Sequence, residues 1–472
     1  MLAGRFLRKI LRWTIPLIIF IFLFESFIDR AYAMTTDEEK KMGRKVLLEI
    51  EREADVISDL TVQAFVEKVG YSLVDYVGPT PFEFKFYVVT SPEANAFAIP
   101  GGYIFVTTGL LVLAENEQEI AGVLAHEISH VTQRHIAQMV EKSKRLNIAS
   151  MVAMLAAMLA GRGGAASMAG TAMAQATAGA LALKYTREME TDADQNGLHL
   201  LIKAGYDPNG MINFFNKLQK VSLAMAPNIP PYLLTHPVVE SRISLLGNIL
   251  QMGPKPSGPF KTVENFNKIR AKAFVQEREP QVAVTHFQSV VDANSESGEG
   301  YYGLGLAYRK MGRFDKSAEV LQRACALAPN DLDMARELGI TYFFLGKMDK
   351  AIENFEAIRA SPGESRNGDL LILYYLGRAY QEKGDFARAL PLLMKVQKER
   401  PEFSELYYHL GSVCGRTGQK GLSHFYFGKH FMLRREKNNA LLHFRTAVDW
   451  LERGSPEREE AQREIKEITS PQ

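Results

Sequence analysis

Residues 123–131 read VLAHEISHV, and the string Ala125-His126-Glu127-Ile128-Ser129-His130 within them restricts the fold more than any other part of the chain. On a helix, His126 and His130 project from the same face, so both imidazoles can reach one metal ion. Glu127 follows the first histidine, which places its carboxylate beside such an ion rather than on it. From there the carboxylate can take a proton from a metal-bound water and pass it to a leaving amine.

The residues around this string are apolar, which predicts a buried helix. Val123, Leu124, Ala125 and Ile128 surround the two histidines. On a surface helix the same string would be solvated charge, but burying two histidines and a glutamate without a partner would be costly. Zinc suits such a site because it accepts nitrogen and oxygen ligands and keeps one position open. We therefore expect one Zn²⁺ ion per chain, with the glutamate as general base.

A catalytic zinc site normally has a third protein ligand, and a second segment offers candidates. Residues 186–197 read TREMETDADQNG. Glu190 and Asp194 are four apart, so one can bind the metal while the other supports a histidine ligand. Spacing alone does not choose between Glu188, Glu190, Asp192 and Asp194.

Composition excludes several classes of protein. The chain has 472 residues, of which 46% are hydrophobic and 23% charged, so it is globular and long enough for two or three domains. A formal net charge of +2 gives no global electrostatic reason to expect nucleic-acid binding. Two cysteines, Cys325 and Cys414, exclude a disulfide scaffold and a multi-cysteine metal cluster, so the metal must rely on histidine and carboxylate.

The first 33 residues have the pattern of a secretory signal peptide. A basic stretch precedes the apolar run 14–24, and Ala31-Tyr32-Ala33 supplies small residues before a cleavage site. The alternative is an uncleaved anchor over residues 6–28, but a spanning helix needs about 20 apolar residues and Glu25 and Asp29 interrupt this run. We expect cleavage and export, which leaves a nearly neutral mature protein.

The chain up to residue 255 is predicted to be an α+β domain, mostly helical with a small sheet. Phe82, Phe84 and Phe86 alternate with polar residues before a strand-like run to residue 89. Residues 96–106 predict a hairpin around Pro100-Gly101-Gly102. Helices are expected over four ranges: 34–78, 109–114, 118–141 and 185–204.

A stretch rich in Ala, Met and Gly covers residues 148–183, and it carries no charged residue from Gly163 to Leu183. Its glycines make a stable membrane span doubtful. A buried helical pair and a mobile lid over the metal are the two alternatives, with membrane contact as a third.

After the linker-like residues 253–259, the sequence repeats. Leu304-Gly305 with Tyr308 and Gly312 recurs 34 residues later, and further copies begin at Leu376-Gly377 and Leu410-Gly411. A period of 34 is typical of tetratricopeptide repeats, which stack helix pairs into a solenoid and usually bind partners. We therefore expect three parts: a signal peptide (1–33), a zinc metallopeptidase domain (34–255) and an all-α tetratricopeptide-repeat domain (256–472).

Three motifs in order resemble the gluzincin metallopeptidases of the HtpX and CAAX prenyl endopeptidase type: residues 95–111 (NAFAIPGGYIFVTTGLL), 125–131 and 186–197. The repeats and the export signal resemble the periplasmic branch of that family, which assists outer-membrane β-barrel assembly. The resemblance implies a zincin-like fold, with Glu190 as third zinc ligand and Asp194 as the carboxylate that supports a histidine. Thr186 replaces the family's usual serine.

Thr235-His236-Pro237 followed by Arg242 matches another element of the family. The resemblance implies that His236 caps the open zinc position at rest, or stabilises the oxyanion together with Arg242. The alternative is an extended loop followed by a surface ion pair.

The resemblance also implies a substrate-binding strand. Asn95, Ala96, Phe97 and Ala98 would form the open edge on which an extended polypeptide lies by β-addition. The alternative is that these residues form an interior strand.

These features together predict a periplasmic zinc endopeptidase that degrades misfolded or misassembled outer-membrane proteins. Its repeat domain would bind substrate or the outer-membrane assembly machinery, and peripheral membrane contact is an additional expectation. The alternative is a chaperone or scaffold for envelope assembly whose zinc site is latent because His236 caps it. A cytosolic repeat adaptor would require residues 1–33 not to be a signal.

Overall fold

The structure is a computed structural model, and it describes most of the chain from Met34 onward. The described ranges are 34–54, 57, 59–142, 185–224, 230–237, 240–253, 259–263, 265–361 and 366–470. The predicted signal peptide, and all of the stretch 148–183 rich in Ala, Met and Gly, lie outside them. Within the described ranges, no helix is long and apolar enough to cross a membrane.

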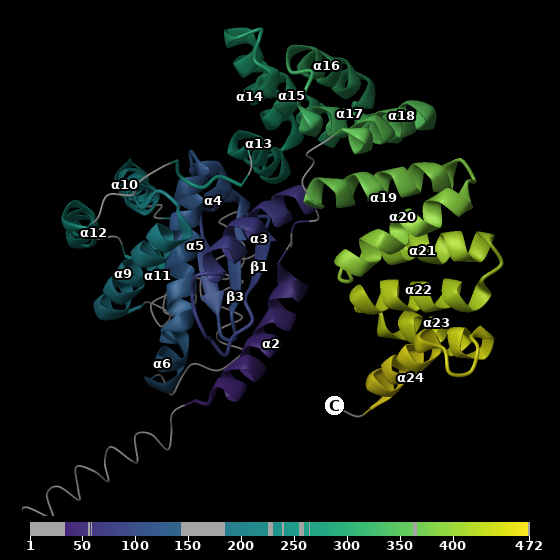
Figure 1. Cartoon of the computed structure of the whole chain (residues 1–472), viewed down its shortest axis with the longest axis horizontal. Helices are drawn as coiled ribbons and strands as arrows, with labels where there is room; N and C mark the ends of the chain where they lie inside the picture. The colour runs from purple at the N-terminus through teal and green to yellow at the C-terminus, as the bar shows by residue number, and fades with distance from the viewer. Residues whose placement is uncertain are drawn as a thin grey trace, which may run out of the picture. The chain divides into compact units, whose positions relative to one another are not determined.

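The chain divides into two compact units, the first ending at Glu277 and the second beginning at Arg278. Figure 1 shows the first as a small sheet surrounded by helices. Its elements are α2 (Thr36–Glu53), α3 (Leu60–Val74), β1 (Lys85–Val89), β2 (Ala96–Ile99), β3 (Tyr103–Thr107), α4 (Thr108–Leu113), α5 (Glu117–Thr132), α6 (His135–Lys142), α9 (Arg187–Ala204), α10 (Asn209–Ala224), α11 (Pro231–Thr235), α12 (Glu240–Met252) and α13 (Phe266–Glu277).

The sheet has the strand order β1-β3-β2. Strands β2 and β3 pair antiparallel, with Phe97 opposite Phe105, which confirms the predicted hairpin. Strand β1 pairs with β3 in parallel. After β1 the chain first forms β2 at the far edge of the sheet and then turns back, so that β3 lies between β1 and β2. The turn between β2 and β3 uses Gly101 and Gly102 at positive φ, a conformation that glycine adopts without steric cost. Among the described strands, β2 therefore lies at an edge.

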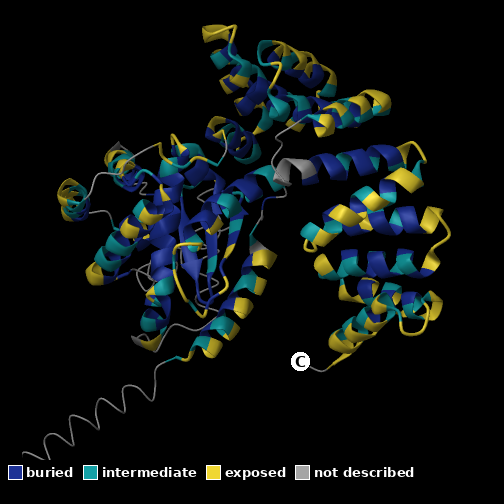
Figure 2. Cartoon of the chain, in the orientation of Figure 1, coloured by how far each residue is buried: buried dark blue, intermediate teal, exposed yellow. Residues whose placement is uncertain are grey.

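Helix α5 is the centre of this unit's core. It packs against β2 and β3 on one side and against α3, α9 and α10 on the others. Figure 2 shows α5 and the neighbouring strands almost entirely in the colour of buried residues. Asn116 caps the helix by accepting the amide N–H of Glu119 at 3.1 Å. The buried helix predicted from the apolar flanks of the histidines is thus confirmed.

The sequence predicts one helix over residues 118–141, and this prediction is wrong in one respect. The helix breaks after Thr132, and α6 starts at His135. Arg134 between them has φ +55°, the left-handed conformation that non-glycine residues rarely adopt. Its guanidinium donates to Glu39 Oε2 at 2.8 Å and to the carbonyl of Met34 at 2.6 Å. No glycine or proline marks the break, so the sequence did not reveal it.

At Arg134 the backbone conformation is expected to destabilise the folded protein, and the side-chain ion pair is expected to stabilise it. Replacing Arg134 with Ala should remove the ion pair and keep the unfavourable φ, whereas replacing it with Gly should remove the ion pair alone. Because a left-handed residue with a Cβ costs about 1–2 kcal/mol, we expect the Gly variant to be more stable than the Ala variant by about 1 kcal/mol. Calorimetric melting of both variants beside the wild type measures this difference. Equal melting temperatures would contradict the backbone assignment.

The second unit is a series of paired helices, which confirms the tetratricopeptide solenoid. At Leu338-Gly339, a Cβ on the glycine would lie 2.7 Å from the ring of Phe355, so only glycine allows the two helices of that repeat to pack this closely. The helices are α14 (Pro280–Ala293), α15 (Gly298–Lys310), α16 (Phe314–Leu327), α17 (Leu332–Phe344), α18 (Met348–Ala360), α19 (Arg366–Glu382), α20 (Phe386–Glu399), α21 (Ser404–Arg416), α22 (Lys420–Leu433), α23 (Lys437–Trp450) and α24 (Pro456–Thr469).

Helix α13 follows the predicted linker 253–259 and packs with the first unit, against α3 and α4. Phe266 lies with its ring centroid 5.6 Å from that of Phe65, and Lys272 pairs with Asp59 at 3.0 Å. The two cysteines are free thiols on α16 and α21. Burial raises the pKa of each to about 11.

Candidate metal centre

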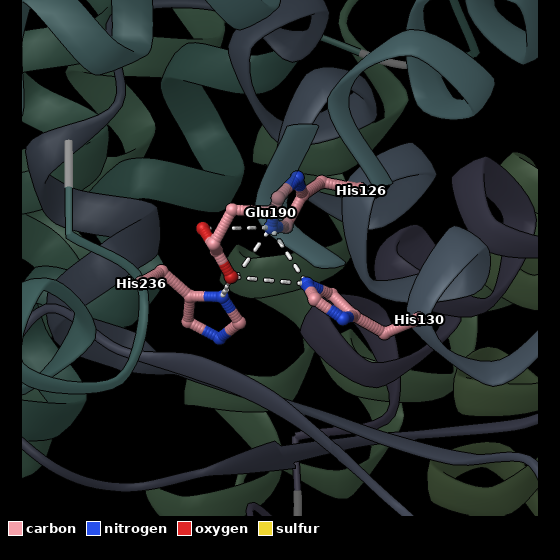
Figure 3. A group of neighbouring side chains, drawn as sticks. All are labelled: His126, His130, Glu190 and His236. Atoms are coloured by element: carbon pink, nitrogen blue, oxygen red, sulfur yellow. Dashed lines mark hydrogen bonds and ion pairs between the residues drawn. The ribbon is translucent and has the colours of Figure 1, made fainter. Parts of the chain in front are cut away.

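Four side chains from three separate segments converge in the first unit. His126 and His130 come from α5, Glu190 from α9, and His236 from the residue that follows α11. Figure 3 shows the three imidazoles directed at the Glu190 carboxylate. One ligand atom from each residue lies within 4.8 Å of all the others, and all four residues are buried.

The distances within this cluster are short. His130 Nε2 lies 3.0 Å from His126 Nε2, and His236 Nδ1 lies 3.3 Å from His126 Nε2. Glu190 Oε1 lies 3.0 Å from His236 Nδ1 and 3.4 Å from His130 Nε2. Three ring nitrogens and a carboxylate oxygen around one point form the donor set that zinc prefers.

Glu127 lies beside the cluster and is not part of it. It is fully buried, and neither carboxylate oxygen has a hydrogen-bond partner among the described residues. His236 Nε2 lies 3.6 Å from its Oε1. Burial raises the pKa of Glu127, and the neighbouring His236 and His126 lower it in part. The structure thus places a buried carboxylate next to the candidate ligands, with an ion-pair contact to His236 and no hydrogen bond among the described residues.

Electrostatics favour the metal-binding protonation states of His130 and Glu190. Burial holds the pKa of His130 well below its ordinary value, so its imidazole is neutral. Burial alone would raise the pKa of Glu190, but His236, His130 and His126 together hold it well below its ordinary value. The pKa of His236 is raised, because Glu127 and Glu190 outweigh its burial. A neutral imidazole and an ionised carboxylate are the forms that bind metals.

Asp194 and Arg242 contact the cluster residues on the side away from the converging ligand atoms. Asp194 Oδ1 lies 3.0 Å from His126 Nδ1, the nitrogen that faces away from the cluster. Arg242 donates from Nε and Nη2 to the two oxygens of Asp194, at 2.6 and 2.7 Å. Its Nη1 lies 2.5 Å from Glu190 Oε2 and donates to the carbonyl of Pro237 at 2.7 Å. The pKa of Arg242 is raised because these carboxylates outweigh its burial.

Helix α9 reaches α5 through a close contact at Gly197. A Cβ there would lie 3.1 Å from the carbonyl carbon of Ala125, next to the first histidine. The helix starts at a cap in which Thr186 accepts the amide N–H of Met189 at 3.2 Å, so threonine provides the same cap that serine would. This packing turns Glu190 and Asp194 toward the histidines.

The structure thereby separates the four acids that spacing left open. Glu190 lies in the cluster, and Asp194 contacts His126. Asp192 lies 3.3 Å from His135 Nε2, and Glu188 is exposed.

Asn95, Ala96, Phe97 and Ala98 lie at and just before the start of β2. The carbonyl of Asn95 accepts the amide N–H of Thr107 at 3.0 Å, while its buried side-chain amide has no hydrogen-bond partner among the described residues. The ring of Phe97 stacks on Phe105 at 5.0 Å. These residues therefore pair with β3 on one side only, among the strands described.

Sequence reasoning missed three aromatic or imidazole side chains at this centre. Tyr185 stacks on His130 with ring centroids 3.8 Å apart, and Tyr232 stacks on His236 at 4.7 Å. His135 contacts His130 from α6. The tyrosines lie next to the motifs, so their proximity was a usable signal, whereas His135 depends on the helix break.

Comparison with known proteins agrees with this geometry. Residues 59–250 match peptidase family M48, and residues 270–331, 305–365 and 372–402 match tetratricopeptide repeats. The beta-barrel assembly-enhancing protease of Yersinia pestis is 30% identical over 305 residues, which cover 63% of this chain and 62% of that protein. The chain thus spans less than two thirds of that relative.

The mitochondrial metalloendopeptidase OMA1 of Schizosaccharomyces pombe is 28% identical over 213 residues, 44% of this chain and 60% of that protein. A crystal structure of MamA is 21% identical in sequence, with a TM-score of 0.29. The match covers 38% of this chain and 99% of the MamA chain. The residues around the four converging side chains, from 59 to 250, are a peptidase family M48 domain, and tetratricopeptide repeats follow it.

Proposed function

We propose that the protein is an exported zinc endopeptidase that cleaves misfolded or misassembled polypeptides. The observation that carries this proposal is the buried cluster of His126, His130, Glu190 and His236, with the buried carboxylate of Glu127 beside it. The match to peptidase family M48 supports the same reaction. The Yersinia relative is named a beta-barrel assembly-enhancing protease, which supports a role for this protease in β-barrel assembly.

The residues present fit a zinc ion. His126 and His130 would bind through Nε2 and Glu190 through a carboxylate oxygen, because these atoms converge. Asp194 would support the outer nitrogen of His126. When bound, the ion would supply a Lewis acid that lowers the pKa of the attacking water to about 7.

Glu127 would move the proton in this reaction. Its carboxylate is buried beside the cluster and makes no hydrogen bond among the described residues, so it can accept the proton of the attacking water. Its raised pKa makes it a stronger base than an exposed glutamate. It would then deliver the proton to the leaving nitrogen.

His236 would have two roles, and it could not perform both at the same moment. With Nδ1 directed at Glu190, it occupies the fourth corner of the cluster, as a cap would. If it swings away, its ring could donate to the oxyanion of the tetrahedral intermediate. The oxyanion role predicted for Arg242 stays a prediction, since all its guanidinium nitrogens contact a carboxylate or a carbonyl in this state.

The substrate would bind as an extended strand along β2. This strand pairs only with β3 among the described strands, and antiparallel addition of a peptide at its other edge would bring a peptide bond to α5. The side-chain amide of Asn95 would then gain a backbone partner from the peptide. The repeat domain (256–472) would bind substrate or the outer-membrane assembly machinery, as solenoids of this kind bind partners.

Metal removal tests the proposal directly. Purified chain without residues 1–33 should cleave an unfolded outer-membrane β-barrel protein, and 1,10-phenanthroline should abolish this cleavage because it removes the ion from the cluster. Addition of one equivalent of Zn²⁺ should restore it. Mass spectrometry of the products identifies the peptide bonds that are cleaved, and metal analysis gives the zinc content of the protein.

The non-chelating isomer 1,7-phenanthroline serves as the control and should leave cleavage intact. Persistent cleavage by the metal-free chain would overturn the proposal. Amino-terminal sequencing of the exported protein tests the signal, since a start at Met1 would contradict cleavage after Ala33.

A second candidate function is a chaperone or scaffold for envelope assembly with a latent zinc site. The observation that favours it is the position of His236 among the candidate ligands, where it would leave no open corner for water. The two candidates differ in whether the general base is needed in the cell, and the Glu127 variant described in the Discussion separates them.

A further inference from the structure

A fourth histidine, His135, links the candidate metal centre to a further carboxylate, that of Asp192. His135 is the first residue of α6 and is 3% exposed. Its Nδ1 lies 2.9 Å from Nδ1 of His130, and its Nε2 lies 3.3 Å from Oδ2 of Asp192. The three side chains thus form a continuous chain of contacts from a candidate ligand on α5 to an acid on α9.

One arrangement of protons satisfies every contact in this chain. The Nε2 atom of His130 faces the cluster, so a metal-binding His130 keeps its lone pair there and carries its proton on Nδ1. That proton requires an acceptor, which Nδ1 of His135 supplies. The proton of a neutral His135 is then on Nε2, where it faces the carboxylate of Asp192.

The Asp192 carboxylate, the last member of this series of contacts, is itself held in place by a hydrogen bond. Asn196 donates from Nδ2 to Oδ1 of Asp192 at 3.0 Å, which leaves Oδ2 for His135. Helix α9 therefore supplies a carboxylate to each histidine ligand. Asp194 serves His126 directly, and Asp192 serves His130 through His135.

The backbone makes this contact possible. On an uninterrupted α-helix, residues five apart are separated by about 140° around the axis, so residue 135 would face away from His130. The break at Arg134, with its left-handed φ of +55°, brings the His135 ring to within 5.0 Å of the His130 ring. The ion pair of Arg134 with Glu39 holds this turn.

We propose that His135 and Asp192 are positioning residues that hold His130 in the tautomer and orientation required for zinc, and so set the metal affinity of the site. The inference rests on the proposed function for the presence of zinc. Partners of this kind on metal-bound histidines contribute about 10–100-fold to metal affinity.

Zinc competition on the full mature chain tests the proposal. The variants are His135→Leu, which removes the acceptor, and His135→Asn, whose side-chain oxygen can occupy the position of Nδ1. Asp192→Ala removes the carboxylate that His135 contacts. The matched control is His199→Leu, because His199 is an exposed histidine on the same helix α9. Titration against a chromophoric chelator of known zinc affinity gives each Kd. Melting of the metal-free variants reports their folding.

We expect the Kd for Zn²⁺ to rise about 10–100-fold in His135→Leu, to rise less in Asp192→Ala, and to stay within about 3-fold of wild type in His135→Asn. At saturating zinc, kcat should recover while the melting temperature of the metal-free chain stays the same. Unchanged zinc affinity in His135→Leu would overturn the inference, and so would equal losses in the Leu and Asn variants. If the Leu variant does not fold, Asp192→Ala and His135→Asn still decide between these outcomes.

Failure of this inference differs from failure of the proposed function. If the wild-type chain binds no zinc, the proposed function is contradicted. If the wild type and His135→Leu both bind zinc with the same affinity, only the role of His135 is contradicted.

Discussion

Replacement of Glu127 by Gln should abolish proteolysis and leave zinc binding intact. The amide keeps the shape of the side chain but cannot accept the proton of the attacking water, and general-base catalysis typically contributes about 10²–10⁴-fold. Zinc should stay, because Glu127 lies beside the converging ligand atoms and is not one of them. Product analysis on an unfolded β-barrel protein and metal analysis of the same preparation measure both quantities.

The same variant should not lose stability. The Glu127 carboxylate is fully buried without a hydrogen-bond partner among the described residues, and its pKa is raised by that burial. A raised pKa means that the ionised group destabilises the folded metal-free chain as the pH rises above the ordinary glutamate range. The neutral amide removes this effect, so metal-free Glu127→Gln should melt at or above the wild-type temperature at neutral pH.

Glu188→Gln is the matched control, since Glu188 is an exposed acid on α9. It should cleave at the wild-type rate. Undiminished cleavage by Glu127→Gln would refute its role as general base. In a deletion strain, full restoration of the envelope by Glu127→Gln would favour the chaperone function over the endopeptidase.

The second large effect is expected from Arg242→Met, which should strongly destabilise the first unit. The guanidinium contacts both Asp194 and Glu190, and all three side chains are buried. Removing one partner of a buried ion pair leaves the others uncompensated, which typically costs about 3–5 kcal/mol. For a unit of this size that corresponds to a fall in melting temperature of about 10 °C.

Calorimetry of the metal-free chain measures this shift, with the repeat domain as an internal reference. Arg242→Lys should lose less, because lysine keeps the charge but not the planar fork. Arg359→Met is the matched control, since Arg359 pairs with Glu356 at 3.1 Å in a partly exposed i,i+3 contact. Such contacts contribute about 0–1 kcal/mol. A melting temperature for Arg242→Met within about 1 °C of wild type would contradict the buried ion pair.

Local patterns in the sequence predicted much of the fold. The hairpin follows from the two short apolar runs 96–99 and 103–106 on either side of Pro100-Gly101-Gly102, and the solenoid from a period of 34 with glycines at the helix contacts. The pairing of His126 with His130 follows from helical geometry alone. Each of these features depends on residues close together in the chain, and that is why sequence periodicity reveals it.

Tertiary packing decided the rest of the centre. The four acids of α9 are equivalent by spacing, and the packing of α9 against α5, with Gly197 close to Ala125, determines which of them face the histidines. Arg242 could have been a surface residue, but the approach of α12 to α9 buries it against two carboxylates.

The sequence by itself determined that this chain holds a buried metal-binding helix followed by a repeat solenoid, because helical periodicity and repeat length are local properties. Only the tertiary structure decided that His135 supports His130, because that contact needs a left-handed turn at Arg134. The turn is held by Glu39, 95 residues earlier in the sequence. Such a distant contact leaves no mark on the local pattern, so no reading of residues 118–141 alone could have revealed it.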